Sequence, residues 1–370
     1  MNKIFIEDCC EILDSMRVPI TASKREIGEY PYYGANGIQD YVADYIFDDE
    51  LVLLAEDGGN FGSKERPIAY RVSGKCWVNN HAHVLKPKVG LDIDYLCYSL
   101  MFYKVDGLIN GATRKKLTQA AMRKMQIPFR SIKEQIHIVN ELNRIIKIKE
   151  KRQEELKLLD NLIKARFVEM FGDVIHNDRK WECRKFSDIT ASRLGKMLDT
   201  KHQTGTCQYS YLANFNVQWF GFELKNLNKM DFNEKDREEF CLEDGDLLVC
   251  EGGEIGRCAV WHNQVENCFF QKALHRVRCN QEIILPDYLA WWFKYNCDHG
   301  GFVAIEGAKA TISHLTGAKM KMLNVTVPPI GLQKQFTSFV NQVDKSKVAV
   351  QKALDETQIL FDSLMQKYFG

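Results

Sequence analysis

The stretch FTSFVNQVDKSKVAVQKALDETQILFDSLMQKY, residues 336–368, decides the architecture of this chain. Its apolar residues recur in alternating steps of four and three, and only Lys347 and Thr357 interrupt the pattern. A seam sustained for nearly five heptads without proline or glycine predicts one long amphipathic helix that pairs with another helix. The expected seam residues are Phe336, Val340, Val343, Val350, Leu354, Phe361 and Leu364.

Residues 131–172 predict the matching helix, which Gly172 closes. Two apolar stripes lie on either side of the polar stretch 149–155. At a rise of 1.5 Å per residue each helix spans about 55–60 Å, which a small domain cannot cover. We therefore expect the two helices to pair antiparallel, with a globular unit at each end. The seam residues expected here are Ile132, Ile136, Val139, Ile146, Leu156, Leu159 and Ile163.

The chain repeats one design twice. An apolar strand leads into the turn Asp57-Gly58-Gly59-Asn60-Phe61-Gly62, and a similar strand later leads into Glu251-Gly252-Gly253-Glu254-Ile255-Gly256. Five further short matches follow in the same order at offsets that stay between 192 and 200, which argues against chance. The matched pairs are 79–83 with 271–275, 94–96 with 287–289, 111–112 with 307–308, 127–128 with 327–328, and 134–135 with 334–335.

Each copy consists of a β-rich segment followed by a helix. Residues 41–55, 68–85, 209–224 and 246–262 carry β-branched and aromatic residues between glycine, asparagine and proline, which is typical of strands. We predict an α+β fold with two β-rich globular domains joined by a pair of long antiparallel coiled-coil helices, arranged as a pseudo-twofold internal repeat. The predicted boundaries are 1–130 for the first domain, 131–172 for the first helix, 173–328 for the second domain and 329–370 for the second helix.

The composition, 45% hydrophobic and 27% charged, is that of an ordinary globular protein. No run approaches the roughly 20 apolar residues that a membrane span needs, and the first residues lack a signal layout, so we expect a cytoplasmic protein. The 12 cysteines form no CxxC pair and fit no zinc pattern, so we expect buried thiols and no bound metal. Because the net charge is only +1, any contact with nucleic acid must come from locally clustered lysine and arginine.

No catalytic constellation emerges from the sequence. The glycine turns match neither a dinucleotide fingerprint nor a phosphate loop, and their repetition favours a structural hairpin or bulge. Asp57, His81 and His83 could be metal ligands or acid–base groups, but Ala273 replaces His81 in the second copy, which favours core or hydrogen-bonded histidines. Motifs of hydrolases, zinc proteases, nucleases and adenine methyltransferases are absent. We therefore expect a non-catalytic chain that binds no cofactor itself.

Basic, aromatic and amide residues gather in loop-like stretches of both copies. Arginine and lysine position a protein on phosphates, whereas asparagine, glutamine and histidine read base edges. Any one of these clusters can also be an ordinary solvated loop. Our candidates for contact with double-stranded DNA are Lys24, Arg25, Tyr32, Tyr33, Asn36, Asn79, Asn80, Arg114, Lys115, Lys116, Arg193, Lys196, Lys201, His202, Tyr209, Lys309 and His314.

The two copies differ in segments that should be similar if both copies had the same function. Residues 21–45 and 193–240 share almost no sequence, although the strand-turn and helix segments match. Two related scaffolds that carry unrelated loops indicate two different targets.

The layout resembles the specificity subunit of type I restriction–modification systems, over essentially the whole chain. Residues 32–37 followed by 49–53, and residues 181–189, are similar to the openings of its target recognition domains. The helix preludes 127–135 and 327–335 and the endings 159–162 and 361–364 resemble those of its spacer helices. No single motif is diagnostic, but the combination is specific.

The resemblance implies a subunit for bacterial defence in which each recognition domain reads one half of a split DNA target. The helix pair would act as a ruler for the unread gap. It also implies two docked modification (methyltransferase) subunits that carry S-adenosylmethionine and catalysis, and restriction/translocase subunits in the full complex.

Two other functions stay open. The chain could be an enzyme of DNA modification or cleavage with an unrecognised motif, which activity of the purified chain alone would reveal. It could also be a coiled-coil scaffold without a DNA role, which the absence of sequence-dependent DNA binding, even with modification subunits present, would support.

Overall fold

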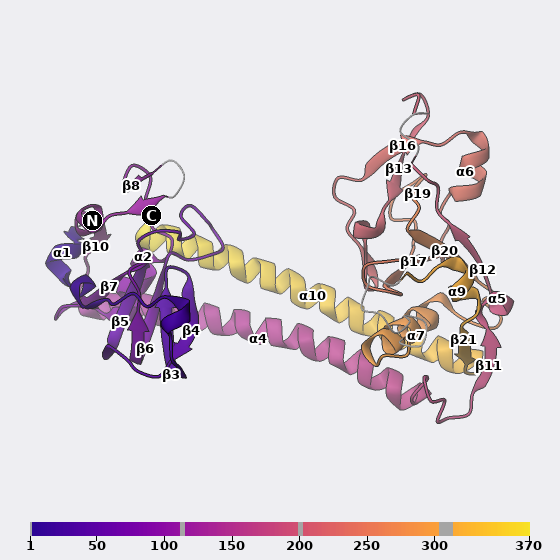
Figure 1. Cartoon of the computed structure of the whole chain (residues 1–370), viewed down its shortest axis with the longest axis horizontal. Coiled ribbons are helices and arrows are strands. Elements are labelled where there is room, and N and C mark those ends of the chain that lie inside the picture. Colours follow the sequence, from indigo (N-terminus) through magenta and orange to yellow (C-terminus); the bar gives the residue numbers. More distant parts are fainter. Residues whose placement is uncertain (1, 112–114, 199–202, 303–313) are drawn as a thin grey trace. The chain divides into compact units, whose positions relative to one another are not determined.

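The computed structural model describes residues 2–111, 115–198, 203–302 and 314–370. The chain divides into two compact units, one of residues 1–154 with 350–370 and one of residues 155–349. Two long helices, α4 (Ile132–Phe171) and α10 (Ile330–Phe369), each contribute a segment to both units (Figure 1). The α+β fold with two β-rich domains and two long helices is the one predicted. Among the described helices, none is long and apolar enough to cross a membrane.

A six-stranded sheet in the order β2-β7-β5-β6-β3-β4 forms the centre of the first unit (Figure 1). Its strands are β2 (Cys10–Ile12), β3 (Ile27–Gly34), β4 (Gly37–Val42), β5 (Phe47–Ala55), β6 (Ala69–Val78) and β7 (Ala82–Pro87). All neighbours are antiparallel except β3 and β6, which run parallel. The second half of β5 is buried without interruption, which explains why it is a continuous apolar run rather than an alternating one.

Shorter elements complete the first unit. Strands β1 and β10 form a separate two-stranded sheet that leads into α4, and β8 pairs with β9. The bounds are β1 (Lys3–Phe5), α1 (Ile6–Cys9), 3-10 turns at Asp14–Met16 and Ala22–Lys24, α2 (Ile93–Met101), β8 (Ile109–Asn110), β9 (Lys116–Leu117), α3 (Gln119–Arg123) and β10 (Gln126–Pro128).

The second unit repeats this plan with a divided sheet. One sheet has the order β12-β20-β17-β18 and another the order β16-β13-β19, where β13 and β19 are parallel. The single strand β6 of the first unit thus corresponds to two short strands, β18 and β19. The bounds are β11 (Glu182–Lys185), α5 (Phe186–Ile189), β12 (Thr190–Leu194), β13 (Gln208–Leu212), a 3-10 turn at Asn214–Asn216, β14 (Val217–Gln218), β15 (Gly221–Phe222), β16 (Asn228–Asp231), α6 (Glu234–Phe240), β17 (Leu247–Cys250), β18 (Cys258–Val260), β19 (Phe269–Phe270), β20 (Leu274–Cys279), α7 (Pro286–Asp298), α9 (Gly317–Lys321) and β21 (Asn324–Val327).

Helices α4 and α10 pair antiparallel within each unit. In the first unit the Tyr368 hydroxyl donates to Glu141 over 2.6 Å, and Arg152 donates to the Thr357 hydroxyl. In the second unit Lys347 lies 2.8 Å from Asp160. Residue numbers rise along α10 as they fall along α4, which is the antiparallel order predicted.

Most of the predicted seam residues are at least half-buried, but the prediction that Ile132 and Ile136 belong to the seam is wrong. Their side chains are 45% and 46% exposed. The start of α4 packs on its own domain, where Tyr98 of α2 donates to Asn143 over 2.5 Å, so a neighbouring face of the helix is buried. The residues buried on that face are Gln135, Ile138, Val139, Leu142 and Ile145.

The remaining seam residues divide into two groups. Those that are buried are Val139, Ile163, Phe336, Val340, Val343, Phe361 and Leu364. Those that are half-buried are Ile146, Leu156, Leu159, Val350 and Leu354.

Phe167 of α4 is central to the core of the second unit. Its ring centroid lies 5.5 Å from that of Phe336 on α10, 5.9 Å from Tyr288 and 6.4 Å from Trp291, both on α7. Aromatic pairs at such distances add stability beyond the apolar area that they bury. One side chain therefore joins both long helices to the domain.

We predict that Phe167→Ala destabilises the protein by about 3–5 kcal/mol, because it removes a fully buried ring and leaves a cavity. Urea unfolding followed by circular dichroism measures this change. Val168→Ala is the matched control, since Val168 is the next residue on the same helix and is 44% exposed, so its substitution should change stability by less than about 0.5 kcal/mol. Equal effects of both substitutions would contradict the central position of Phe167.

Candidate nucleic-acid interface

A glycine turn follows the central strand of each unit. Strand register pairs Leu54 with His83 in the first unit and Val249 with His275 in the second. This register aligns Glu56 with Glu251, so the sequence alignment that matched Asp57 with Glu251 is wrong by one residue. The reason is that glycine-rich turns can be slid by one residue in sequence, whereas the strand partner fixes the register.

The same two backbone hydrogen bonds hold the acidic residue at the start of each turn. Glu56 N–H donates to His81 O over 2.9 Å, and Glu251 N–H donates to Ala273 O over 3.0 Å. Their carbonyls accept from Leu117 N and Leu315 N, in each case over 2.7 Å. These bonds hold Leu117 and Leu315 beside the turn. The described residues that directly precede them are the predicted DNA contacts Lys115, Lys116 and His314, all exposed.

An asparagine amide contacts each turn from the neighbouring loop. Asn36 Nδ2 donates to Gly58 O over 2.9 Å, and Asn214 Nδ2 donates to Gly252 O over 3.0 Å. The Oδ1 atom of Asn214 also accepts from Arg257 over 2.8 Å. One amide N–H of each residue is thus committed to the turn, and in Asn214 the carbonyl oxygen is committed as well.

These asparagines reveal a likeness between segments that the sequence treated as unrelated. Each follows a strand that runs parallel to its neighbour, β3 beside β6 and β13 beside β19. Asn79 N–H donates to Tyr33 O, and Gln271 N–H donates to Leu212 O, each over 3.0 Å. The expectation that 21–45 and 193–240 share almost nothing holds for their sequences but is wrong for this part of their structure.

Of the other predicted residues of the first unit, some are buried and some are exposed. Arg25 pairs with Asp40 at 3.2 Å and stacks 4.2 Å above the Tyr32 ring. Tyr32 and Asn79 are only 1% and 3% exposed, so the prediction that they touch DNA directly is wrong. Both residues support the loops instead. The residues that remain accessible are Lys24, Tyr33, Asn36, Asn80, Lys115 and Lys116.

In the second unit, two of the predicted basic residues contact helix α6. Lys196 lies 2.6 Å from Asp236, and Arg193 forms an ion pair with Glu239. The Tyr209 hydroxyl accepts from Arg237 over 2.9 Å. These pairs partly neutralise the cluster, an effect that residue type alone could not reveal. The predicted contacts Arg114, Lys201, His202 and Lys309 lie outside the described residues.

A buried charge cluster supports the turn of the first unit. Asp14, Glu56 and His83 offer ligand atoms within 4.8 Å of one another. The two ring nitrogens of His83 lie 2.7 Å from Asp14 Oδ2 and 2.9 Å from Leu117 O. Arg17 and Lys116 pair with Glu56 at 2.6 and 3.0 Å. Because other protein groups already contact these ligand atoms, the cluster fits a structural charge network better than a metal site.

The equivalent histidine of the second unit has a simpler environment. His275 is 2% exposed, and burial lowers its pKa. Its Nε2 has no hydrogen-bond partner among the described residues. Both histidines are thus core residues, the interpretation that the sequence favoured. Asp57 pairs instead with the half-exposed His81, at 2.7 Å.

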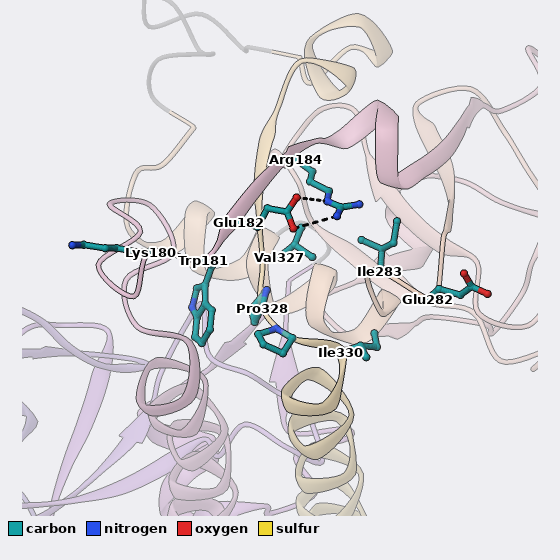
Figure 2. Close-up of a pocket in the computed structure, with 10 residues that line it drawn as sticks. Lys180, Trp181, Glu182, Arg184, Glu282, Ile283, Val327, Pro328 and Ile330 are labelled. Carbon is teal, nitrogen blue, oxygen red and sulfur yellow. Dashed lines mark hydrogen bonds and ion pairs between the residues drawn. The ribbon is translucent and has the colours of Figure 1, made fainter.

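A pocket in the second unit lies at the start of α10, away from the glycine turn in sequence. Figure 2 shows Trp181 and Pro328 beside it, and Glu182 bridged to Arg184 at 2.8 and 3.2 Å. None of the predicted DNA contacts lines this pocket. The lining residues are Lys180, Trp181, Glu182, Arg184, Glu282, Ile283, Val327, Pro328, Pro329 and Ile330.

Comparison with known proteins gives consistent matches. The family model of the type I restriction modification DNA specificity domain matches residues 1–158 and again residues 178–357. A protein of Haemophilus influenzae named as a type I restriction enzyme specificity subunit is 27% identical over 350 residues, which cover 92% of this chain and 86% of that protein. The EcoprrI specificity subunit of Escherichia coli is 26% identical over 119 residues, 32% of this chain and 28% of that protein.

Solved structures share the fold. The S subunit of a type I restriction–modification system from M. genitalium matches with a TM-score of 0.58 and 14% identity. A chain from a structure on assembly and conformational transition of the type I R-M system matches with a TM-score of 0.61 and 13% identity. Each match covers 100% of this chain and 96% of the other.

We predict that Asp14→Asn weakens the fold most at neutral pH. Burial alone would raise the Asp14 pKa, but hydrogen bonds and charge from His83, with bonds from Val84 and Gln119, bring it below the ordinary value of an aspartate. The ionised carboxylate therefore stabilises the fold above this value, and the stabilisation is lost as pH falls through the folded pKa. The loss at about pH 7 should be about 1–3 kcal/mol and should shrink toward about pH 3.

Urea unfolding at a series of pH values measures the difference. Asp8→Asn, at an exposed carboxylate of the same unit, is the control and should change stability little at any pH. A difference between Asp14→Asn and the native chain that stays constant with pH would contradict the ionic role of Asp14.

Proposed function

The chain belongs to the type I restriction modification DNA specificity domain family, and we propose that it reads a split DNA target, with one half-site for each unit. The family assigns DNA sequence specificity, and its specificity subunits are generally non-catalytic. The observation that carries the bipartite proposal is the repeated turn: Glu56 and Glu251 are held by the same backbone bonds, with an asparagine amide on each turn.

Different surroundings of the same turn support two different half-sites. The first unit has one long strand, β6, where the second has β18 and β19. The second unit adds helix α6 and, beside its turn, the β14–β15 hairpin, where Trp219 donates to Glu254 over 2.5 Å. A shared frame fixes where a reading loop is held, and side chains around it determine which bases fit. Each mismatched base pair in a well-read half-site costs about 1–3 kcal/mol.

The accessible basic residues suit contact with phosphates. Lys24 and Lys115 are exposed, and Lys116 keeps about half of its side chain exposed although it pairs with Glu56. Such groups give affinity and register on a duplex, while amide and aromatic groups nearby discriminate bases. In the second unit His314 takes the corresponding position before Leu315. Affinity should therefore fall as salt concentration rises.

Apolar residues that are exposed or half-buried at the start of each long helix support docking of two modification subunits. In the first unit Phe129, Ile132 and Ile136 are 42–46% exposed. In the second unit the pocket of Figure 2 presents Trp181 and Ile330 at the same point of the repeat. A surface that recurs at both helix starts would bind the same partner twice. In this proposal the modification subunits bind S-adenosylmethionine, and restriction/translocase subunits join for cleavage.

The long helices support a ruler function. Both run for 40 residues without interruption, and antiparallel contacts bind them within each unit. A stiff spacer holds two reading sites at a fixed separation without the entropy that a flexible linker would lose on binding.

We predict that replacing residues 180–320 with the equivalent segment of a family member that has another target changes one half of the methylated motif only. The first unit keeps its own turn and loops, so its half-site should stay the same. Methylome sequencing of cells that express the chimera with the modification subunits reads both halves at once. A motif altered in both halves would refute one half-site per unit.

The enzyme alternative makes the opposite prediction for the purified chain. We expect no methyl transfer from S-adenosylmethionine and no cleavage by the chain alone, and methyl transfer once modification subunits are added. Activity of the chain alone would overturn the proposal.

We predict that Asn36→Ala and Asn214→Ala each weaken discrimination at one half-site, by roughly threefold to tenfold, through the loss of one hydrogen bond that holds the turn. The modification complex is titrated with duplexes in which either half is scrambled. Asn140→Ala, at an exposed asparagine of α4, is the matched control. Equal losses at both half-sites in each variant would contradict this assignment.

A further inference from the structure

A fully buried glutamine lies in the first turn of each long helix. Gln135 of α4 and Gln333 of α10 are both 0% exposed. A neutral amide is costly to bury unless its donors and acceptor find partners, so each side chain must be accounted for by contacts.

In the first unit Gln135 joins three segments of the chain. Its Oε1 accepts from Asp92 N over 2.8 Å, at the residue that caps α2. Its Nε2 donates to Gly90 O over 3.0 Å and to Arg130 O over 2.9 Å. The helix is thereby bound to the loop before α2 and to the connection after β10.

The second unit repeats this arrangement atom for atom. Gln333 Oε1 accepts from Leu285 N over 2.8 Å, at the residue before α7. Its Nε2 donates to Ile283 O over 3.0 Å and to Pro328 O over 2.8 Å. The sequence comparison paired Gln135 with Gln335, but Gln335 is exposed, so that pairing is wrong by two residues.

At each joint, the place where a domain meets the start of its long helix, a buried tyrosine adds a further hydrogen bond. Tyr95 of α2 donates to Pro128 O of β10 over 3.0 Å, and Tyr288 of α7 donates to Thr326 O of β21 over 2.9 Å. Each domain helix is therefore bonded both to the strand that leads into the long helix and, through glutamine, to the long helix itself. Rotation of the domain about this point would break all of these bonds together.

We propose that Gln135 and Gln333 are positioning residues that fix the orientation of each DNA-reading domain on its long helix and so set how strictly the gap between half-sites is measured. This inference rests on the proposed function. A stiff helix can act as a ruler only if the reading domains are attached to it rigidly, because movement at the joint would let one domain shift along the duplex. Apolar packing alone is not directional, whereas three hydrogen bonds to one amide fix an angle as well as a distance.

The test measures gap preference separately from base preference. The complex with modification subunits is given duplexes that keep both native half-sites while the gap is shortened or lengthened by single base pairs. A second panel keeps the gap and scrambles one half-site at a time. The variants are Gln135→Leu, Gln333→Leu and the double variant. Gln135→Glu, which keeps the size and the acceptor but loses the donor, covers the case in which the leucine variants fail to fold.

We expect the preference for the native gap length to fall about tenfold in folded variants, which corresponds to one or two lost hydrogen bonds. Base discrimination should stay within about twofold of the native value. Gln153→Leu and Gln342→Leu, at exposed glutamines of the same helices, are the controls and should keep the native gap preference.

A native gap preference in folded Gln135 and Gln333 variants would overturn the inference. So would a loss of base discrimination that accompanies the loss of gap preference, because the residues would then act on the reading surface itself. A native complex without any preference for a split target refutes the proposed function, an outcome that is visible before any variant is made.

Discussion

The burial of both long helices in the cores of both units is the constraint on which the rest of the structure depends. Phe361 and Leu364, near the end of the chain, belong to the core that contains β5 and α2. Phe167 and Phe336 belong to the core that contains β17 and α7. The first unit completes its core only with residues 350–370 of α10, and the core of the second unit includes Phe167 of α4, so each unit uses the long helix of the other copy of the repeat. The two domains are thus linked in folding.

Polar residues that interrupt the seam of one long helix bond to residues of the other long helix. Arg152, in the polar stretch of α4, donates to the Ala353 carbonyl and the Thr357 hydroxyl of α10, and Lys149 donates to Gln358. Lys347 pairs with Asp160 at 2.8 Å. A polar group in a coiled-coil seam lowers stability but specifies one register, since a shifted helix would leave it buried and unpaired. In the proposed ruler function, a single register of the helix pair matters more than the last increment of stability.

In the proposed function, the repeat separates two requirements of DNA recognition. The backbone bonds of the glycine turn and those of the glutamine joint recur, and an asparagine amide bonds each turn, at carbonyls that differ by one residue. In the proposed function these bonds hold the reading surface in place. The surroundings differ: Arg17, Lys116 and His83 form a charged network under one turn, whereas His275 under the other is buried and its Nε2 lacks a partner among the described residues. One frame with two surfaces is what two unrelated half-sites require.

The sequence by itself determined the duplication, the two long helices and their antiparallel pairing, because collinear short matches, apolar periodicity and helix length can all be read without knowing which residues meet in space. It also found the acid-Gly-Gly turns. It could not determine register, and it misaligned Glu251 by one residue and Gln333 by two, since only the partner strand or loop fixes which residue occupies an equivalent position. Residue type suggested Tyr32 and Asn79 as contacts and Ile132 as a seam residue. The tertiary structure decided otherwise, because burial depends on which neighbours pack around a residue, and these neighbours come from distant parts of the chain.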